Sequence, residues 1–595
     1  MVKVSDYVID FLASVGIKDI FMVSGGAAMH LVDSVGRKKS IKYYCNYNEQ
    51  ATSYSAEGYS RVNDSMGACL VTSGPGGTNA ISGVASCWVD SVPIIVISGQ
   101  VKRELIADYS KLRQIGEQEI NIIDMVKPIT KYAVTIKDPN KIRYHLEKAV
   151  FLAKNKRPGP VWINIPLDVQ GSRVDKKRLL PFPKPKPSKD KTLKNKVVRA
   201  LDLLNRAKRP VILLGNGIKI SKSNDLISKL LKCVKVPVLL SFNGMDILPE
   251  NHPLYIGKPG IIGQRRANFC IQNADCVMSI GSRLNLKIIG YDYKAFAKQA
   301  KLIVVDIDSE ELKKRTISPD LAINANAKCF LLELLSQAKK KPLVADEKWL
   351  TACRYWKRHY IPLEKEAHRD KRHVNTYAFF DKLSDLLSGR DIVVTGNGLA
   401  ALSLYQAFKV KRGQRVFTNN GYGAMGWGLP ASIGASIAKG KNRVICVTGD
   451  GSIAMNVQEL ELIRHHKLPV KIFVLNNSGY SSIRHTQDSF FKGFHVGSDD
   501  KSGVGSLDFN KIAKVFDLKY IYIGRNIQLN KNIQAVLGSV GPVLCEVNIA
   551  RKQGVSPKTT SYVGKDGKIK SRALEDMYPF LPRQELLKNM EISRG

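Results

Sequence analysis

An aspartate between two glycines and a downstream pair of asparagines are the residues whose types and spacing best suit metal-assisted chemistry. The Gly-Asp-Gly sequence at 449–451 follows an apolar run. Its glycines permit a tight turn and a close approach of backbone to a ligand, and a helix starting there would offer its N-terminal amides to anionic oxygen. One helix and one returning strand fit before the Asn-Asn sequence at 476–477. We therefore expect Asp450 and Asn477 at the carboxyl ends of neighbouring parallel strands, where α/β sheets bind ligands.

The ligand chemistry of this pair points to a hard cation. A carboxylate and an amide oxygen, without histidine or cysteine beside them, suit Mg²⁺ that keeps phosphate oxygens among its ligands. A Gly-Asp-Gly sequence alone is usually a surface turn. The asparagine pair at this spacing argues against that alternative and predicts a site for a metal-bridged diphosphate.

The elements that must position these residues are parallel sheets. Short apolar, β-branched runs alternate with longer helical patterns along the chain, which is typical of α/β folds. Such runs are apolar on both faces, as expected for strands covered by helices. Examples lie at 93–97, 210–214, 302–306 and 471–475.

Two linkers divide the chain into three predicted domains. The stretch 174–196 alternates proline and lysine, which favours an extended connector, and 337–346 is a shorter one. The domains are then 1–175, 197–340 and 346–595, each of ordinary domain size.

A faint internal repeat relates the first domain to the third. Residues 71–99 and 444–477 both show a strand, a glycine-rich turn, a helix, a proline and a second apolar strand. Generic α/β duplication would give the same pattern, so the repeat by itself does not decide the architecture. We predict three doubly wound parallel sheets, with two related domains flanking a Rossmann-like middle domain.

Composition indicates a folded, soluble protein. Of 595 residues, 44% are hydrophobic and 24% are charged. Charges interrupt the first 21 residues, and no apolar run is long enough to cross a bilayer, so the expected location is cytoplasmic. The ten cysteines are scattered, mostly in apolar stretches, and are expected to be reduced core residues.

The charge balance leaves an alternative of another class open. Lysine and arginine total 92 against 52 acidic residues, a formal net charge of +40. Such an excess attracts polyanions. No basic run is interleaved with aromatics, so a lysine-rich surface is the simpler explanation. A non-catalytic protein that binds nucleic acid or another polyanion remains the rival hypothesis.

The two motifs together resemble the signature of the thiamine-diphosphate-dependent 2-oxo-acid decarboxylase and acetolactate synthase superfamily. The resemblance implies that Asp450 and Asn477 bind Mg²⁺ with the carbonyl of Gly479, and that Met425 wedges under the cofactor. It makes the first domain pyrimidine-binding, and the last domain diphosphate- and metal-binding with a basic tail. Further implied cofactor contacts are Gly398, Gly423, Gly449, Gly451, Ser452 and Tyr480.

A matching acid lies near the start of the chain. Residues 46–51 and 56–61 resemble the catalytic-glutamate segment of the family, with Glu49 as the acid. In that role, a buried carboxyl hydrogen-bonds to the cofactor pyrimidine and promotes the tautomer that deprotonates the thiazolium. Without the resemblance, Glu49 would be taken for an ordinary surface acid.

Further segments are similar to acetolactate synthase. Residues 72–79 imply cofactor contacts at Pro75 and Asn79. The resemblance also places Gly26 beside the reacting carbonyl and Gln118 at the substrate. Without the resemblance, Gly26 could equally be a residue of an ordinary turn, and Gln118 could equally be a solvated helix residue.

The likeness to acetolactate synthase weakens around the substrate. Glu117 stands where that family has phenylalanine, and Thr486 stands where it has a tryptophan that shapes the acceptor pocket. The tail at 558–579 resembles a subgroup often associated with unusual sugar biosynthesis. The acceptor of the two-carbon unit from pyruvate is therefore either a second 2-oxo acid or a keto-sugar nucleotide.

Cofactor content and assembly complete these expectations. Residues 257–260, 281–285 and 306–309 fall where acetolactate synthases bind FAD, but an acidic pair usual there is missing, so FAD is left open. Relatives place the domain carrying the Glu49-type acid of one subunit against the Gly-Asp-Gly domain of another. The resemblance therefore implies a homodimer or a dimer of dimers.

Overall fold

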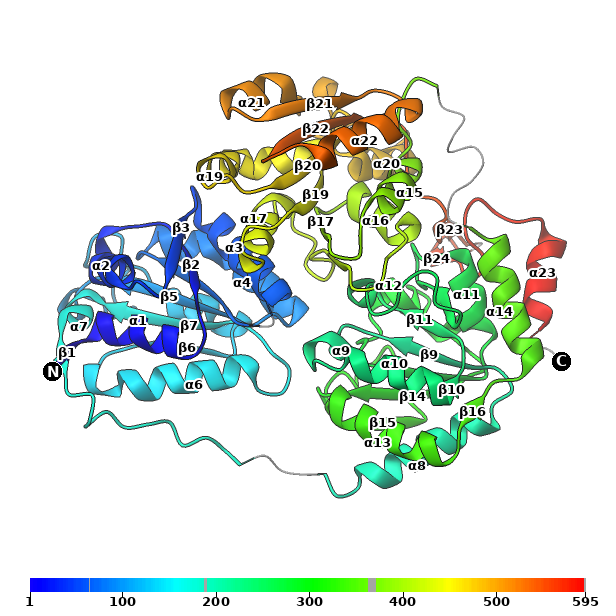
Figure 1. Cartoon of the computed structure of the whole chain (residues 1–595), viewed down its shortest axis with the longest axis horizontal. Helices are drawn as coiled ribbons and strands as arrows, with labels where there is room; N and C mark the ends of the chain where they lie inside the picture. Colours follow the sequence, from blue (N-terminus) through cyan, green and yellow to red (C-terminus); the bar gives the residue numbers. More distant parts are fainter. Residues whose placement is uncertain (64, 187–189, 362–370, 565, 593–595) are drawn as a thin grey trace.

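The computed structural model describes residues 1–63, 65–186, 190–361, 371–564 and 566–592 (Figure 1). Three six-stranded, all-parallel sheets, each flanked by helices, make up the fold. This confirms the predicted α/β class. The expected runs form β5 (Ile94–Gln100), β9 (Pro210–Leu214), β14 (Lys301–Asp306) and β20 (Val470–Asn476).

The first sheet has the order β3-β2-β4-β5-β7-β6. Every connection in it is a crossover, as parallel pairing requires. Its other strands are β2 (Asp19–Met22), β3 (Lys42–Cys45), β4 (Gly67–Val71), β6 (Tyr132–Thr135) and β7 (Val161–Pro166). The main helices are α1 (Val4–Ser14), α2 (Met29–Arg37), α3 (Glu49–Asn63), α4 (Pro75–Asp90) and α6 (Ile142–Lys154).

The last sheet has the order β18-β17-β19-β20-β22-β21. With strands counted from the first in each sheet, the first and last sheets share the order 2-1-3-4-6-5, which supports the repeat suggested by the sequence. Its strands are β17 (Ile392–Thr395), β18 (Arg415–Phe417), β19 (Val444–Gly449), β20, β21 (Lys519–Ile523) and β22 (Val543–Asn548). Its helices include α15 (Thr376–Leu386), α16 (Leu399–Ala407), α17 (Gly428–Ala438), α18 (Asp450–Ile453), α20 (Ser481–Phe490) and α22 (Leu529–Gly538).

The middle sheet differs, because its order β12-β11-β9-β13-β14-β15 corresponds to 3-2-1-4-5-6. That is the doubly wound Rossmann order, in which ligands bind where the strand order reverses. The remaining strands are β11 (Val238–Leu240), β12 (Tyr255–Gly257), β13 (Cys276–Ile280) and β15 (Leu321–Asn324). Its helices include α8 (Leu193–Arg206), α10 (Asn224–Cys233), α11 (Arg265–Asn273), α13 (Ala327–Lys340) and α14 (Glu347–His359).

The predicted linkers are only partly irregular. Helix α8 begins at Leu193, inside the first one, and residues 187–189 of that stretch lie outside the described residues. The second, at 337–346, is wrong as a linker. Its first part continues helix α13, and β16 (Leu343–Val344) pairs in parallel with β10 (Val234–Lys235). The apolar side chains of this stretch pack into the middle core, which overrides its lysine-rich composition.

Helix α3 of the first domain lies against helix α17 of the last domain (Figure 1). The two backbones approach so closely that a Cβ at Gly58 would lie 2.1 Å from the carbonyl oxygen of Ala431, and a Cβ at Gly434 would lie 1.9 Å from that of Ser55. One hydrophobic core cluster continues from the first domain into the last. This contact joins the two domains within one chain.

Two remaining expectations concern cysteines and membranes. All ten cysteines are free, but Cys45 and Cys329 are exposed, so the expectation of core cysteines is wrong for these two. Within the described ranges, no helix combines the length and apolarity needed to cross a bilayer.

Candidate functional site

The predicted cation ligands lie at one edge of the last sheet. Strands β19 and β20 pair in parallel with Gly449 beside Leu475, so Asp450 and Asn477 follow neighbouring strand ends. Asp450 is 7% exposed, and its carboxylate accepts hydrogen bonds from the backbone N–H of Asn477 (3.5 Å) and of Gly479 (2.7 Å). Burial raises the pKa of Asp450, while these backbone donors oppose the shift. The proximity expected from spacing is therefore present.

The turn after Asn477 has an unusual backbone. Ser478 has a φ of 58° and Gly479 a φ of 122°. Only glycine adopts the second value without strain, and a Cβ at Gly479 would also lie 2.3 Å from the carbonyl oxygen of Ser498. The ring of Tyr480 packs over the Gly-Asp-Gly turn, since a Cβ at Gly451 would lie 2.2 Å from it. The two motifs are thus in direct contact.

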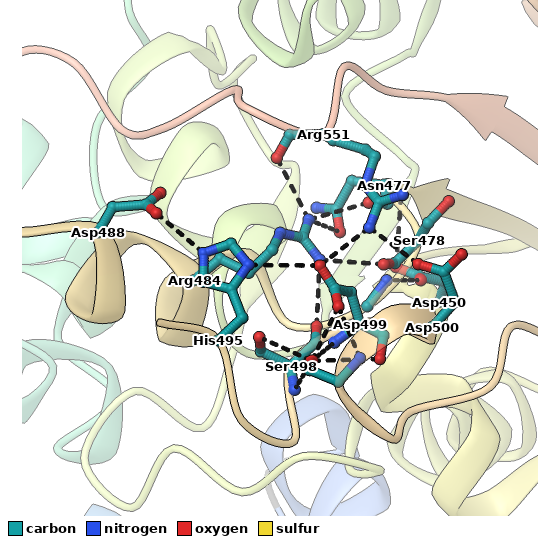
Figure 2. Close-up of polar contacts among 12 residues, drawn as sticks. Asp450, Asn477, Ser478, Arg484, Asp488, His495, Ser498, Asp499, Asp500 and Arg551 are labelled. Carbon is teal, nitrogen blue, oxygen red and sulfur yellow. Dashed lines mark hydrogen bonds and ion pairs between the residues drawn. The ribbon is translucent and has the colours of Figure 1, made fainter. Parts of the chain in front are cut away.

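Arg484 is a residue at this site that the sequence analysis missed. Its guanidinium is buried beneath the turn and donates to the carbonyl oxygens of Asn477 (2.9 Å) and Ser478 (2.9 Å) and to the side-chain oxygen of Asn477 (3.2 Å) (Figure 2). Neighbouring residues gave no signal of burial, because α20 is largely polar and exposed.

Glycines around the same sheet edge leave room for a ligand. Gly398, with a φ of 71°, precedes helix α16, and a Cβ there or at Gly449 would meet nothing within 4 Å. The carbonyl of Gly423 accepts a hydrogen bond from Asn397, and Ser452 Oγ accepts one from the N–H of Gly426 (2.9 Å). These contacts hold the loop that carries Met425, which is half-buried, beside the Gly-Asp-Gly turn.

This arrangement fits the magnesium diphosphate that the motifs predicted. The open glycine positions form a cradle for phosphate oxygens, and α18 begins at Asp450. In the part of the chain that the structure describes, no group of three or more histidine, cysteine, aspartate or glutamate side chains could hold a metal. A cation bound by Asp450 would draw its remaining ligands from amide, carbonyl and phosphate oxygens.

Glu49 begins helix α3 and is 8% exposed. One carboxylate oxygen accepts a hydrogen bond from the side-chain amide of Asn79 (3.0 Å). The other lies near Gly76, where an added Cβ would be 3.4 Å away. Asn79, predicted as a cofactor contact, therefore orients the predicted catalytic acid. The placement overturns the alternative that Glu49 is an exposed surface acid.

The other predicted substrate residues gather around the same loop. A Cβ at Gly25, next to Gly26, would lie 2.5 Å from Thr72, and one at Gly74 would lie 2.2 Å from the carbonyl oxygen of Gln118. Gly26 itself faces open space. Pro75 opens helix α4. Gln118 is exposed with a φ of 57°, so it is not the solvated helix residue that the alternative interpretation assumed.

Contacts between the two related domains hold the Glu49 segment. The carboxylate of Glu459 accepts hydrogen bonds from the side-chain amide of Asn46 (2.8 Å) and the N–H of Tyr47 (2.9 Å). Burial raises the pKa of Glu459 to about 7. Asn456 also donates to Gln50 (3.2 Å). No sequence signal marked these residues, because their partners lie some 400 positions away.

The middle domain has a cavity of about 180 Å³ at the carboxyl edge of its sheet. Asp306 and Arg283, both in stretches considered for FAD, line it together with Arg157 of the first domain. Arg157 pairs with Asp308 (2.9 Å) and Glu311 (3.0 Å), and Arg283 pairs with Glu311 (2.8 Å). The cavity is smaller than the roughly 300 Å³ typical of ligand pockets.

Comparison with known proteins identifies family models that match most of the chain. The thiamine pyrophosphate enzyme N-terminal TPP binding domain matches 2–125, the central domain matches 197–336, and the C-terminal TPP binding domain matches 396–547.

Individual relatives match over nearly the full length. The chain is 32% identical over 561 residues to an acetolactate synthase large subunit of Cyanidium caldarium, covering 92% of this chain and 93% of the relative. It is 31% identical over 573 residues to acetolactate synthase 1, chloroplastic, of Zea mays (94% and 87%). It is also 31% identical over 561 residues to a probable acetolactate synthase large subunit of Methanocaldococcus jannaschii (92% and 92%).

Proposed function

Because the chain belongs to the thiamine pyrophosphate enzyme family, we propose that it removes CO₂ from pyruvate or a similar 2-oxo acid and joins the remaining unit to a second carbonyl. It is a thiamine-diphosphate-dependent enzyme similar to acetolactate synthase. The family and the enzyme class expected from the motifs are thereby confirmed. The substrates, the cation and the assembly belong to the proposal.

The convergence of Gly398, Gly449, Asp450 and Asn477 at one sheet edge supports this activity most directly. We assign the diphosphate to the glycine cradle, and Mg²⁺ to Asp450, the Asn477 side chain and the carbonyl of Gly479. Bound there, thiamine diphosphate would supply the electron sink for loss of CO₂.

The residues of the first domain would manage protons and orientation. The oxygen of Glu49 that does not face Asn79 is free to bond a ring nitrogen of the cofactor, and the low exposure of Glu49 keeps water from competing. Asn79 fixes the carboxylate in one orientation. A Cβ at Gly26 would meet nothing within 4 Å and Gln118 is exposed, and we assign both residues to contacts with the 2-oxo acid.

The second carbonyl substrate, which accepts the two-carbon unit, is either pyruvate or a keto-sugar nucleotide, and one observation supports the keto-sugar nucleotide. Thr486 is exposed, and its hydroxyl donates to the carbonyl of Ser482, so it fills less space than an indole would. On the same helix, burial and the neighbouring charge of Lys558 lower the pKa of His485. A half-buried lysine near α20 would suit a diphosphate-bearing acceptor.

Product analysis tests these alternatives. The protein is incubated with Mg²⁺, thiamine diphosphate and pyruvate, with and without a keto-sugar nucleotide, and the products are identified by mass. Acetolactate alone would exclude the sugar acceptor, and a branched sugar would support it. Retention of DNA that falls with salt, without any pyruvate turnover, would instead favour the polyanion-binding rival.

We also propose that two chains complete each active site, as a homodimer or a dimer of dimers. Within the described residues of one chain, Glu459 and Asn456 bond the residues that flank Glu49, while Glu49 itself makes no hydrogen bond to Asp450 or Asn477. Mixing Glu49→Gln protein with Asp450→Asn protein, after reversible dissociation, should restore about one quarter of wild-type activity, because half of the dimers then carry one intact site. No restoration would mean that each chain builds its own site.

FAD receives no support from the cavity, whose volume of about 180 Å³ is below the roughly 300 Å³ of typical ligand pockets. The absorption spectrum of the purified protein decides this question. A flavin band would show that the cavity opens further when it is loaded.

A further inference from the structure

The guanidinium of Arg484 donates to three segments of the chain, at the Asn477–Gly479 turn, Ser498 and Arg551. Besides its bonds to Asn477 and Ser478, it donates to the carbonyl oxygens of Ser498 (3.1 Å) and Arg551 (3.2 Å) (Figure 2). The N–H of Tyr480 donates to the same Ser498 carbonyl (2.8 Å). Arg484 is only 5% exposed, so all of these bonds form away from solvent.

The partners of Arg484 distinguish it from two other buried arginines, Arg61 and Arg266. Arg61 pairs with Glu57 and Asp90, and Arg266 pairs with Glu250. Within the described ranges, Arg484 makes no ion pair, and all five of its acceptors are carbonyl or amide oxygens. A planar guanidinium with donors in fixed directions holds such acceptors in one geometry. Arg484 therefore serves to shape the backbone of this turn.

That shape decides which oxygens of the turn remain for a cation. The carbonyls of Asn477 and Ser478 point at Arg484, while the N–H of Gly479 points at Asp450. Ser478 is held at a positive φ, a conformation that persists where surrounding contacts enforce it. Among the hydrogen bonds of the described residues, none ends on the carbonyl of Gly479. The side-chain oxygen of Asn477 is oriented by the same guanidinium.

Acidic side chains lie beyond the carbonyl groups that bond Arg484, and they pair with Arg551. Arg551 pairs with Asp499 (2.9 Å) and Asp500 (2.9 Å), and His495 lies between Asp488 and Asp499. Asp499 also closes the 498–504 loop by bonding Ser502. These contacts hold the Ser498 carbonyl against Arg484, so the 498–504 loop is bonded to the Asn477–Gly479 turn through Arg484.

We propose that Arg484 is a positioning residue for the cation, because it fixes the side chain of Asn477 and leaves the Gly479 carbonyl free as a ligand. This inference rests on the cation site of the proposed function. Mg²⁺ demands near-ideal octahedral geometry, whereas Ca²⁺ tolerates irregular ligands. Loss of Arg484 should therefore harm Mg²⁺ binding more than Ca²⁺ binding.

Equilibrium dialysis of thiamine diphosphate, at increasing Mg²⁺ or Ca²⁺, measures this without turnover. For Arg484→Met, the half-saturating Mg²⁺ should rise by about 10–100-fold, as for other residues that orient metal ligands, and the Ca²⁺ value by less than about threefold. Arg484→Lys should behave similarly, because a point charge cannot hold several carbonyls. It preserves the buried charge and provides the same comparison if the methionine variant does not fold.

Arg266→Met is the matched control, since it removes an equally buried arginine whose partners Glu250, Gln264 and Lys357 include no residue of the turn. Its ratio of Mg²⁺ to Ca²⁺ half-saturation should equal that of the wild type. Equal shifts for both cations in the Arg484 variants, or no shift, would overturn the role of Arg484. A wild-type protein that retains thiamine diphosphate without any divalent cation would instead overturn the cation site itself.

Discussion

The crossing of helices α3 and α17 gives the sharpest stability prediction. A Cβ at Gly58 would lie 2.1 Å from the carbonyl oxygen of Ala431, well below the 3.0 Å that real Cβ contacts reach. Both partners are helix backbone, so the helices must separate by about 1 Å. Overpacking of this kind costs roughly 1–3 kcal/mol or more, against which alanine recovers about 1 kcal/mol of helix propensity.

We expect Gly58→Ala to lower the free energy of unfolding by up to roughly 2 kcal/mol, which is the overpacking cost less the gain in helix propensity. That corresponds to a fall of up to about 8 °C in apparent Tm, measured by differential scanning fluorimetry at one scan rate. The same displacement should weaken activity, because α3 begins at Glu49. Three domains do not unfold as one two-state unit, so the earliest transition is the one to compare.

The matched control is Gly36→Ala on helix α2, where an added Cβ meets nothing within 4 Å. It should raise the stability by up to about 1 kcal/mol through helix propensity alone. The two substitutions are chemically identical, so their opposite signs isolate the crossing. If Gly58→Ala is as stable as Gly36→Ala, the two helices do not approach as closely as described.

Three further predictions concern the site. Glu49→Gln should lower kcat for CO₂ release by about 10²–10⁴-fold, with thiamine diphosphate still retained. Asn79→Ala should lower kcat roughly 10–100-fold, because it removes one hydrogen bond to the Glu49 carboxylate. Equal losses in the two variants would contradict the orienting role of Asn79. Exhaustive chelation of divalent cations should release the cofactor, and added Mg²⁺ should restore its binding. Asp450→Asn should require more Mg²⁺ for that restoration. Retention of the cofactor in the presence of chelator would contradict the cation site. Since burial raises the pKa of Glu459 from 4.5 to about 7, its contribution to stability is greatest below pH 4.5 and falls as pH rises to about 7. Across that pH range, the free energy of unfolding from denaturant titrations should fall by roughly 2–4 kcal/mol more in the wild type than in Glu459→Gln. Parallel pH profiles of the two proteins would contradict a buried Glu459.

Fold class and cofactor motif were predictable because both follow from spacing along the chain. In parallel sheets, a strand, a helix and a returning strand bring successive strand ends to one edge, so the Gly-Asp-Gly turn and Asn477 had to meet. The glycines of that turn marked a close approach by their type alone. Composition was a weaker guide, since the lysine-rich stretch at 337–346 forms helix and strand by packing into the middle core.

Burial and long-range partnership were decided only by the tertiary structure. Arg484 is one of 92 basic residues, and it acquires a role only when Ser498 and Arg551 enclose it. Asn46 and Glu459 are 413 positions apart, and no local pattern relates them. The physical reason is the same in both cases: a polar group is committed by the acceptors and donors that folding brings to it, and those come from segments whose distance along the chain carries no information about contact.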